Sequence, residues 1–555
     1  MGTNGKKGEG AFLVQGAILA AAGIITKIIG VIYRIPLINI MGDQGQGYYG
    51  IAFEIYALAL LLTSYSLPLA VSKLVSARVA KGEHKNAYRV LKAALIFAAA
   101  AGAIAAVVVF FGSDFIATKI MAMGPSQYAL RVLAPGLLVV AIMGVVRGYF
   151  QGLGTMMPTA ISQILEQIVN AIVSVIGASY LLEYGRRAAE LKKQDYLGPA
   201  YAAAGGTLGT LVGAIAGLIC LGFIFFAYRK VMRKQMHKDH TKHEETYQHI
   251  FPILFMTIVP VILSTAVYQS TKILDAGIFS NIMAAQGMER EKYEILWGMY
   301  TGKFNTLVNV PLAIANAIGA SVIPSLTAAI TSGNQKLVHN KINLATRFSM
   351  LVAIPSAVGC FVLARPIMDL LFSGDNTTPS LLLMTGAITI VSYSLSTITN
   401  AMLQGVNRMS TPVKNAAVSL VIHLVSLFVM LVVFKWNIYA VIISTIVFSV
   451  SMCILNSISL KRAIEYKQEK RKTFVIPVIA SVIMGIAAFF AEMFLSRVMP
   501  GKLATVVTVM IAVVVYMVCL LTFGGLTEEE ILAMPKGRML ARIFKKLHLL
   551  KERQF

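Results

Sequence analysis

Cysteine is scarce in the 555-residue chain, and its few positions exclude two kinds of structural site. Its four cysteines all fall within apolar runs: Cys220, Cys360, Cys453 and Cys519. A disulfide framework or a thiolate metal centre needs paired or clustered cysteines. We therefore expect small buried side chains here, with no metal and no cofactor bound through cysteine.

Charged residues are also scarce, at 13% of the chain against 57% hydrophobic residues. An ordinary soluble domain carries about 25% charged residues. Long apolar runs recur along the whole chain, unlike the short alternating segments of a membrane β-barrel. The composition predicts an all-α polytopic membrane protein. Window analysis predicts about fourteen spans, at 11–40, 49–72, 92–121, 129–151, 157–182, 200–228, 249–279, 296–324, 343–372, 380–404, 412–435, 437–460, 473–497 and 503–525.

Acidic residues are outnumbered by basic ones, 25 to 49, which gives a net charge of +24. The basic residues gather in alternate short loops, such as 73–92, 229–242 and 461–472. The positive-inside rule and contact with anionic phospholipids explain this pattern better than binding to nucleic acid. The asymmetry predicts that both termini are cytoplasmic, with the first helix retained rather than cleaved as a signal peptide.

An internal repeat divides the chain. LPLAV at 67–71 resembles VPLAI at 310–314, and FQGLGTMMP at 150–158 resembles LQGVNRMSTP at 403–412. Both halves begin on the same side, so we expect two parallel six-helix lobes with a site between them. The predicted divisions are an N-lobe (1–228), a linker (229–248), a C-lobe (249–460), two further spans (461–526) and an amphipathic tail (527–555).

The linker holds His237, His240 and His243 at intervals of three residues. Such spacing is compatible with metal binding, but a solvated basic connector beside lipid headgroups is the simpler interpretation. We therefore predict no metal and no catalytic residue in this segment.

The first span carries two cations, Lys27 and Arg34, in an otherwise apolar helix. A cation in mid-membrane costs about 3 kcal/mol or more, so it needs a wet cavity or a partner. Glu54 in the second span is a potential partner for Arg34. Pairing of the two would be a purely structural alternative to a ligand site.

Spans seven and eight add Lys272, Asp275, Lys303, Asn305 and Asn309. Lys272 and Asp275 are three residues apart and share a helical face, so they too are candidates for a structural pair. Lys303 near the outer interface is a candidate for snorkelling. Lys27 and Lys303 have no carboxylate one turn away, and this surplus of positive charge favours a cavity for an anionic ligand.

The fifth span carries Gln163, Glu166 and Asn170 on one helical face, and its repeat mate carries Asn415 and His423. Equivalent polar stripes indicate a shared wet interior. Hydrogen bonding between helices, with no ligand, is the alternative.

Three segments carry a resemblance to a known family: KIIGVIYRIPL (27–37), SLPLAVSKLVS (66–76) and RGYFQGLGTMMPTAISQILEQ (147–167). Together with the span count they resemble the MurJ/SpoVB-type branch of the MOP (multidrug/oligosaccharidyl-lipid/polysaccharide) exporter superfamily. The resemblance implies a V-shaped transporter with alternating access, a cationic central cavity, and a groove for a polyprenyl tail at spans thirteen and fourteen.

The resemblance also implies roles for single residues. Lys27 matches the first arginine of the family's first span, whereas the Arg-Asp pair that follows it is replaced here by Tyr33 and Arg34. Lys303 stands for the family's arginine in span eight, eight residues before a proline instead of about five. Asp275 is the candidate for the family's sodium site, so coupling to Na⁺ or H⁺ is an expectation.

The sequence therefore predicts a flippase for a lipid-linked cell-wall precursor in a bacterial cytoplasmic membrane, acting as a monomer. Lys27, Arg34, Lys272 and Lys303 are the expected substrate-binding cations. A flippase for another lipid-linked oligosaccharide and a drug or cation exporter are the alternatives. An intramembrane glycosyltransferase is more remote, because such enzymes need large polar loops or paired catalytic acids, which the chain lacks.

Overall fold

The computed structural model describes residues 3–239, 241, 243–466, 468–526 and 539, and these form helices and no strand. The predicted all-α class is confirmed. In the described part, eleven helices are long and apolar enough to cross a membrane, or twelve with one bent pair. The predicted fourteen spans are not confirmed, partly because Ala21–Val79 counts as one stretch where the sequence predicts two spans. Apart from Met539, the predicted amphipathic tail lies outside the described residues.

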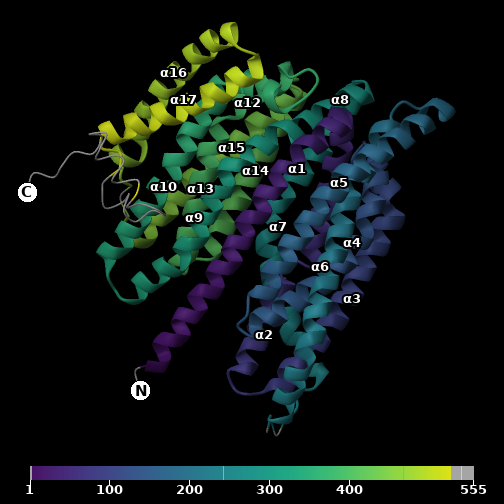
Figure 1. Ribbon diagram of the computed structural model, residues 1–555, viewed down its shortest axis with the longest axis vertical. Coiled ribbons are helices and arrows are strands. Elements are labelled where there is room, and N and C mark those ends of the chain that lie inside the picture. Colours follow the sequence, from purple (N-terminus) through teal and green to yellow (C-terminus); the bar gives the residue numbers. More distant parts are fainter. Residues whose placement is uncertain (1–2, 240, 242, 467, 527–538, 540–555) are drawn as a thin grey trace, which may run out of the picture. The chain divides into compact units, whose positions relative to one another are not determined.

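The chain divides into two compact units, Met1–Gly302 and Lys303–Phe555. The predicted division into lobes at 229–248 rests on the sequence repeat and stays a prediction. The helices of unit 1 are α1 (Thr3–Thr63), α2 (Leu67–Val79), α3 (His84–Phe115), η1 (Ile116–Ile120), α4 (Ser126–Gly152), α5 (Met157–Lys192), α6 (Leu197–His237), α7 (Tyr247–Ala285) and α8 (Arg290–Gly298) (Figure 1).

The boundary between the two units falls within the short π-helix η2 (Met299–Phe304). The long C-terminal helices α16 and α17 of unit 2 pack against each other and are the yellow pair in Figure 1. The helices of unit 2 are α9 (Asn305–Thr331), α10 (Gln335–Val362), α11 (Ala364–Leu371), α12 (Thr377–Gly386), α13 (Ile388–Gly405), α14 (Ser410–Val432), α15 (Ile438–Ile464), η3 (Arg471–Val475), α16 (Ile476–Val498) and α17 (Gly501–Thr522).

Helix α1 is broken at Gly42, where φ is 68° and the backbone is not helical. Glycine adopts this left-handed φ without the steric cost that a Cβ brings. The predicted span 49–72 is also wrong as one continuous helix, because α1 ends at Thr63 and α2 begins at Leu67. Pro68 lies in the first turn of α2, where a missing N–H costs nothing.

Two predicted spans of unit 2 are interrupted. The span at 380–404 is the pair α12 and α13, bent by 44°. A Cβ on Gly386, at this bend, would stand 2.4 Å from the ring of Phe304, so glycine makes room for that ring. The span at 343–372 is divided into α10 and α11 around Leu363.

Helices α5 and α6 lie side by side in unit 1 (Figure 1) because α6 presents a stripe of small residues to α5. Gly205, Gly209, Gly213 and Gly217 recur every four residues. A Cβ on Gly213 would stand 2.6 Å from the carbonyl oxygen of Glu166. This close approach holds the polar stripe of α5 firmly against its neighbour.

Candidate functional site

The seam between α1 and α5 is polar. The Asn170 amide donates to the Tyr33 hydroxyl at 3.3 Å, and its oxygen accepts a hydrogen bond of 2.9 Å from Ser174. Ser174 also donates to the carbonyl oxygen of Gly206 at 2.8 Å, which ties the network to α6. Gln163 is half-buried on the same helix. Part of the predicted stripe therefore binds helices together, as the structural alternative expected.

Arg34 is half-buried in α1, and its Nε is buried with no hydrogen-bond partner among the described residues. Glu54, from the second segment of α1, interacts electrostatically with Arg34 and with Lys272 of α7. Within the described part of the chain, no ion pair joins Arg34 to Glu54. The proposed structural pairing of those two residues is therefore absent, although the charges lie near each other.

Asp275 is buried in α7, with 3% of its surface exposed, and its charge interacts with that of Glu54. One turn earlier, the Thr271 hydroxyl is buried without a hydrogen-bond partner in the described chain. Lys272 is exposed. The structure thus brings Arg34, Glu54, Lys272 and Asp275 into one electrostatic neighbourhood of unit 1.

The charge of the Glu166 carboxylate is neutralised by an ion pair. Arg147 of α4 pairs with it at 2.7 Å between Nη2 and Oε2, and also donates to Ser162 at 3.0 Å. This ion pair joins two helices, α4 and α5. Glu166 is therefore a structural acid in this conformation.

The remaining predicted residues have no described contact with this neighbourhood of unit 1. Lys27 is exposed on α1. Lys303 belongs to unit 2, where it is buried with 1% exposure and its Nζ lies 3.3 Å from the carbonyl oxygen of Ser373. Asn305 is half-buried and Asn309 exposed on α9. Their predicted participation in one cavity with Arg34 stays a prediction.

A buried acid that the sequence did not predict is Glu294 of α8, whose side chain is 1% exposed. It accepts hydrogen bonds from Tyr48 at 2.5 Å and Gln44 at 3.1 Å, and pairs with Arg290 at 2.8 Å. The spacing of Arg290 and Glu294 by four residues was the available signal. This cluster fastens α8 to the segment of α1 just after its break.

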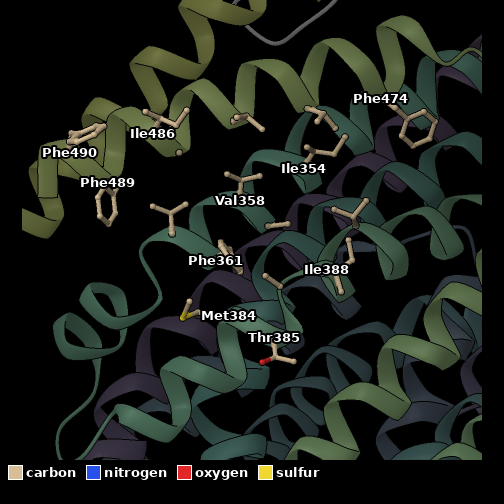
Figure 2. Close-up of a pocket in the computed structure, with 17 residues that line it drawn as sticks. Ile354, Val358, Phe361, Met384, Thr385, Ile388, Phe474, Ile486, Phe489 and Phe490 are labelled. Carbon is tan, nitrogen blue, oxygen red and sulfur yellow. The ribbon is translucent and has the colours of Figure 1, made fainter. Parts of the chain in front are cut away.

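An apolar groove of about 950 Å³ lies in unit 2. Its seventeen lining residues come from α10, α12, α13, η3 and α16 and the residues beside them, and Thr385 alone has a polar side chain. Figure 2 shows apolar side chains such as Phe361, Ile388 and Phe489 turned toward a common space. Helix α17 packs on α16 but contributes no lining residue.

These features define a multi-pass helical membrane protein with ionisable groups inside one unit and an apolar groove in the other. The chain belongs to the polysaccharide biosynthesis protein family, whose model matches residues 13–330. The family resemblance that the sequence motifs indicate is confirmed by this match and by two relatives of nearly equal length.

Two relatives match nearly the whole chain. It is 28% identical over 557 residues to the lipid II flippase MurJ of Bacillus subtilis (strain 168), covering 96% of this chain and 98% of that protein. It is 24% identical to stage V sporulation protein B of the same strain, covering 96% and 99%. Among solved structures, lipid II flippase MurJ in an inward closed conformation matches with a TM-score of 0.64 at 15% identity, covering 91% of this chain and 98% of that one. This last likeness concerns the fold.

Proposed function

We propose that the protein is a flippase that moves a polyprenyl-pyrophosphate-linked cell-wall precursor, lipid II, from the inner to the outer leaflet by alternating access. The observation that carries the proposal is Arg34, a cation in a membrane helix whose buried Nε has no hydrogen-bond partner among the described residues. An anionic ligand would offset the cost of holding that charge in the membrane. The full-length relative named as a lipid II flippase supports this choice of substrate.

The headgroup presents the main physical problem. Moving a bare multiply charged anion through hydrocarbon costs on the order of tens of kcal/mol. Arg34 offers two parallel N–H donors to a phosphate, and Lys272 and Lys27, also in unit 1, add point charges. In this proposal these cations replace the water that the pyrophosphate loses.

The tail stays in an apolar environment throughout. The groove along α10 and α16 suits a polyprenyl chain because its lining is almost wholly aliphatic and aromatic. Lipid tails are as apolar as such a lining, so the groove supplies position and packing rather than a large hydrophobic gain. It would keep the tail beside the protein while the headgroup crosses.

The empty carrier must also reset. Moving one charge through the membrane potential is worth ~2.3 kcal/mol per 100 mV, so voltage is one source of the driving force. A cation gradient is the second source: the oxygens of Asp275, Thr271 and Glu54 are the hard donors that Na⁺ prefers, and the carboxylates also suit H⁺. When bound, the cation would lower the negative charge near Arg34.

A drug or cation exporter of the same superfamily is a weaker proposal: an interior dominated by acids would suit its substrates, and here the cations Arg34 and Lys272 balance the acids Glu54 and Asp275. Transport of a different lipid-linked oligosaccharide, including one used in sporulation, differs from our proposal only in the sugar. We propose a functional monomer in a bacterial cytoplasmic membrane with both termini inside, and no catalytic turnover of the substrate.

Flipping by purified protein in proteoliposomes tests the proposal. Arg34→Ala should reduce the rate of lipid II translocation at least ~10-fold, since a charge-assisted hydrogen bond contributes about 1.5–3 kcal/mol. Arg34→Lys should recover part of the rate. Arg187→Ala, which removes an exposed arginine from α5, is the matched control. Full rescue of a flippase-depleted strain by both Lys27→Ala and Arg34→Ala would contradict the proposal.

A further inference from the structure

A second concentration of positive charge lies at the other end of unit 1, in a pocket of about 590 Å³. Helix α3 supplies Lys85, Arg89 and Lys92. The C-terminal part of α6 supplies Arg233, and Tyr247 lies at the start of α7. Glu244 is the one carboxylate in the lining. Four Lys or Arg side chains against a single acid make this a pocket for an anion.

The pocket is built on a rigid base. Met232, Leu91 and Ile250, from the three helices that line it, share one buried apolar cluster. The linker is also fixed beside it: Arg78 donates to Glu245 at 2.5 Å, and Asp239 accepts a hydrogen bond of 2.6 Å from the backbone N–H of Lys85. The spacing of the cations is therefore set by folded structure and not by a loose loop.

The lining acid neutralises one of the four cations only. Glu244 pairs with Arg89, which also lies 5.8 Å from the centre of the Tyr247 ring. Among the residues that the structure describes, Lys92 and Arg233 have no carboxylate partner. Lys92 instead lies over the Tyr88 ring at 4.8 Å. The charge of Lys85 interacts with that of Asp239. Lys92 and Arg233 thus remain to receive an anion, beside two tyrosines typical of a membrane interface.

Deeper along the same helix faces, the side chains become apolar and exposed. Ile96 is one turn beyond Lys92 and 57% exposed; Phe226 is two turns from Arg233 and 71% exposed; Phe255 is two turns from Tyr247 and 57% exposed. These residues lie roughly 6 to 12 Å along the helices from the pocket. A charged recess followed by an apolar surface at this depth matches a phosphate with acyl chains.

We propose that this pocket binds the phosphate of an anionic phospholipid of the inner leaflet, with acyl chains lying over Ile96, Phe226 and Phe255. The site joins the inner ends of α3 and α6 to the start of α7. A bound lipid therefore stabilises the junction through which the linker connects consecutive helices. The proposal is independent of what the protein transports.

Native mass spectrometry of the full chain, released from micelles with added phosphatidylglycerol or phosphatidylcholine, tests the site. One phosphatidylglycerol should stay bound to the wild type in preference to phosphatidylcholine. A Lys or Arg facing an anionic headgroup strengthens binding about 5-fold, so Lys92→Gln with Arg233→Gln should weaken it ~25-fold. Lys230→Gln with Lys234→Gln removes the same charge from exposed α6 positions outside the pocket and should leave binding unchanged.

Three results would overturn the proposal. If the control double variant loses as much phosphatidylglycerol binding, the basic residues attract lipid through a diffuse electrostatic field and not at one site. Equal retention of phosphatidylcholine would remove the anionic selectivity. If millimolar inorganic phosphate alone raises the unfolding temperature as much as phosphatidylglycerol does, the pocket takes soluble phosphate. Phe226→Ser separates the last two cases further, because it should weaken lipid binding and leave any effect of phosphate intact.

Discussion

The polar neighbourhood of Arg34 in unit 1 and the apolar groove of unit 2 differ in the chemistry of the side chains that form them. Unit 1 keeps ionisable side chains between its helices and satisfies some of them, such as Glu166 with Arg147, while the Nε of Arg34 has no hydrogen-bond partner among the described residues. Unit 2 has a groove in which Thr385 alone of the lining residues has a polar side chain. The difference suits a substrate with a charged head and an apolar tail, because each part would meet surroundings of its own kind.

Unit 1 tolerates its polar groups because its helices pack closely. Small residues of α6 let α5 approach so closely that Ser174 reaches the carbonyl oxygen of Gly206 at 2.8 Å. Close packing excludes lipid from these polar groups and supplies partners for them. In unit 2 the glycine at 485 has another use: a Cβ there would stand 2.9 Å from Val358, so it sets the spacing of α10 and α16 at the groove.

The largest effect is expected from breaking the internal ion pair of unit 1. Glu166→Ala leaves Arg147 without its carboxylate between helices and should lower the free energy of unfolding by about 3 kcal/mol. Denaturant unfolding in detergent micelles measures this loss. Glu183→Ala removes an exposed partner of Arg187 on the same helix and should cost no more than about 0.5 kcal/mol. Equal losses of unfolding free energy in the two variants would mean that Glu166 is as solvated as Glu183 and that its ion pair with Arg147 is not part of a buried interior.

An intermediate effect is expected from making the groove polar. Ile486 lines the groove and is 56% exposed, and Val513 on α17 is 58% exposed but does not line it. Ile486→Asn should slow translocation of lipid II about 10-fold, because an amide against the tail costs about 1–2 kcal/mol. Val513→Asn should have little effect. An unchanged rate for Ile486→Asn would show that the tail lies elsewhere.

The sequence predicted those features of the two units that follow from hydrophobic periodicity and composition. Apolar runs predicted the helices, and a cation inside such a run predicted that Arg34 needs an explanation. The sequence did not predict that Arg147 reaches Glu166, because spacing along one helix is silent about partners on another. It also missed the breaks near Ser64 and Gly386. The hydropathy of the flanking residues continues across both, and only local packing or a following proline interrupts the helix.

The smallest effect concerns a feature that the two units share. Asp239 accepts a hydrogen bond from the backbone N–H of Lys85 at the start of α3, and Glu469 accepts those of Lys472 and Thr473 at the start of η3. Burial acts to raise the pKa of each carboxyl, but hydrogen bonds from backbone N–H groups and from a threonine hydroxyl, together with a nearby cation, outweigh it and hold both pKa values below their ordinary range. A lowered pKa stabilises the fold above the ordinary value and loses that stabilisation as the pH falls through the folded-state value.

Asp239→Asn should therefore lower the free energy of unfolding by about 0.5 kcal/mol at pH 7, the lower end of the range for a lost helix cap. The variant should lose nothing relative to the wild type once the pH is low enough to protonate the carboxyl of the folded protein. Glu469→Gln should show the same sign in unit 2. Unfolding temperatures recorded from pH 7 down to pH 3 measure both. The unfolding temperatures of the wild type and of each variant should converge as the pH falls. A difference that stays constant with pH would mean that the charge of the carboxylate at these helix starts contributes nothing to stability.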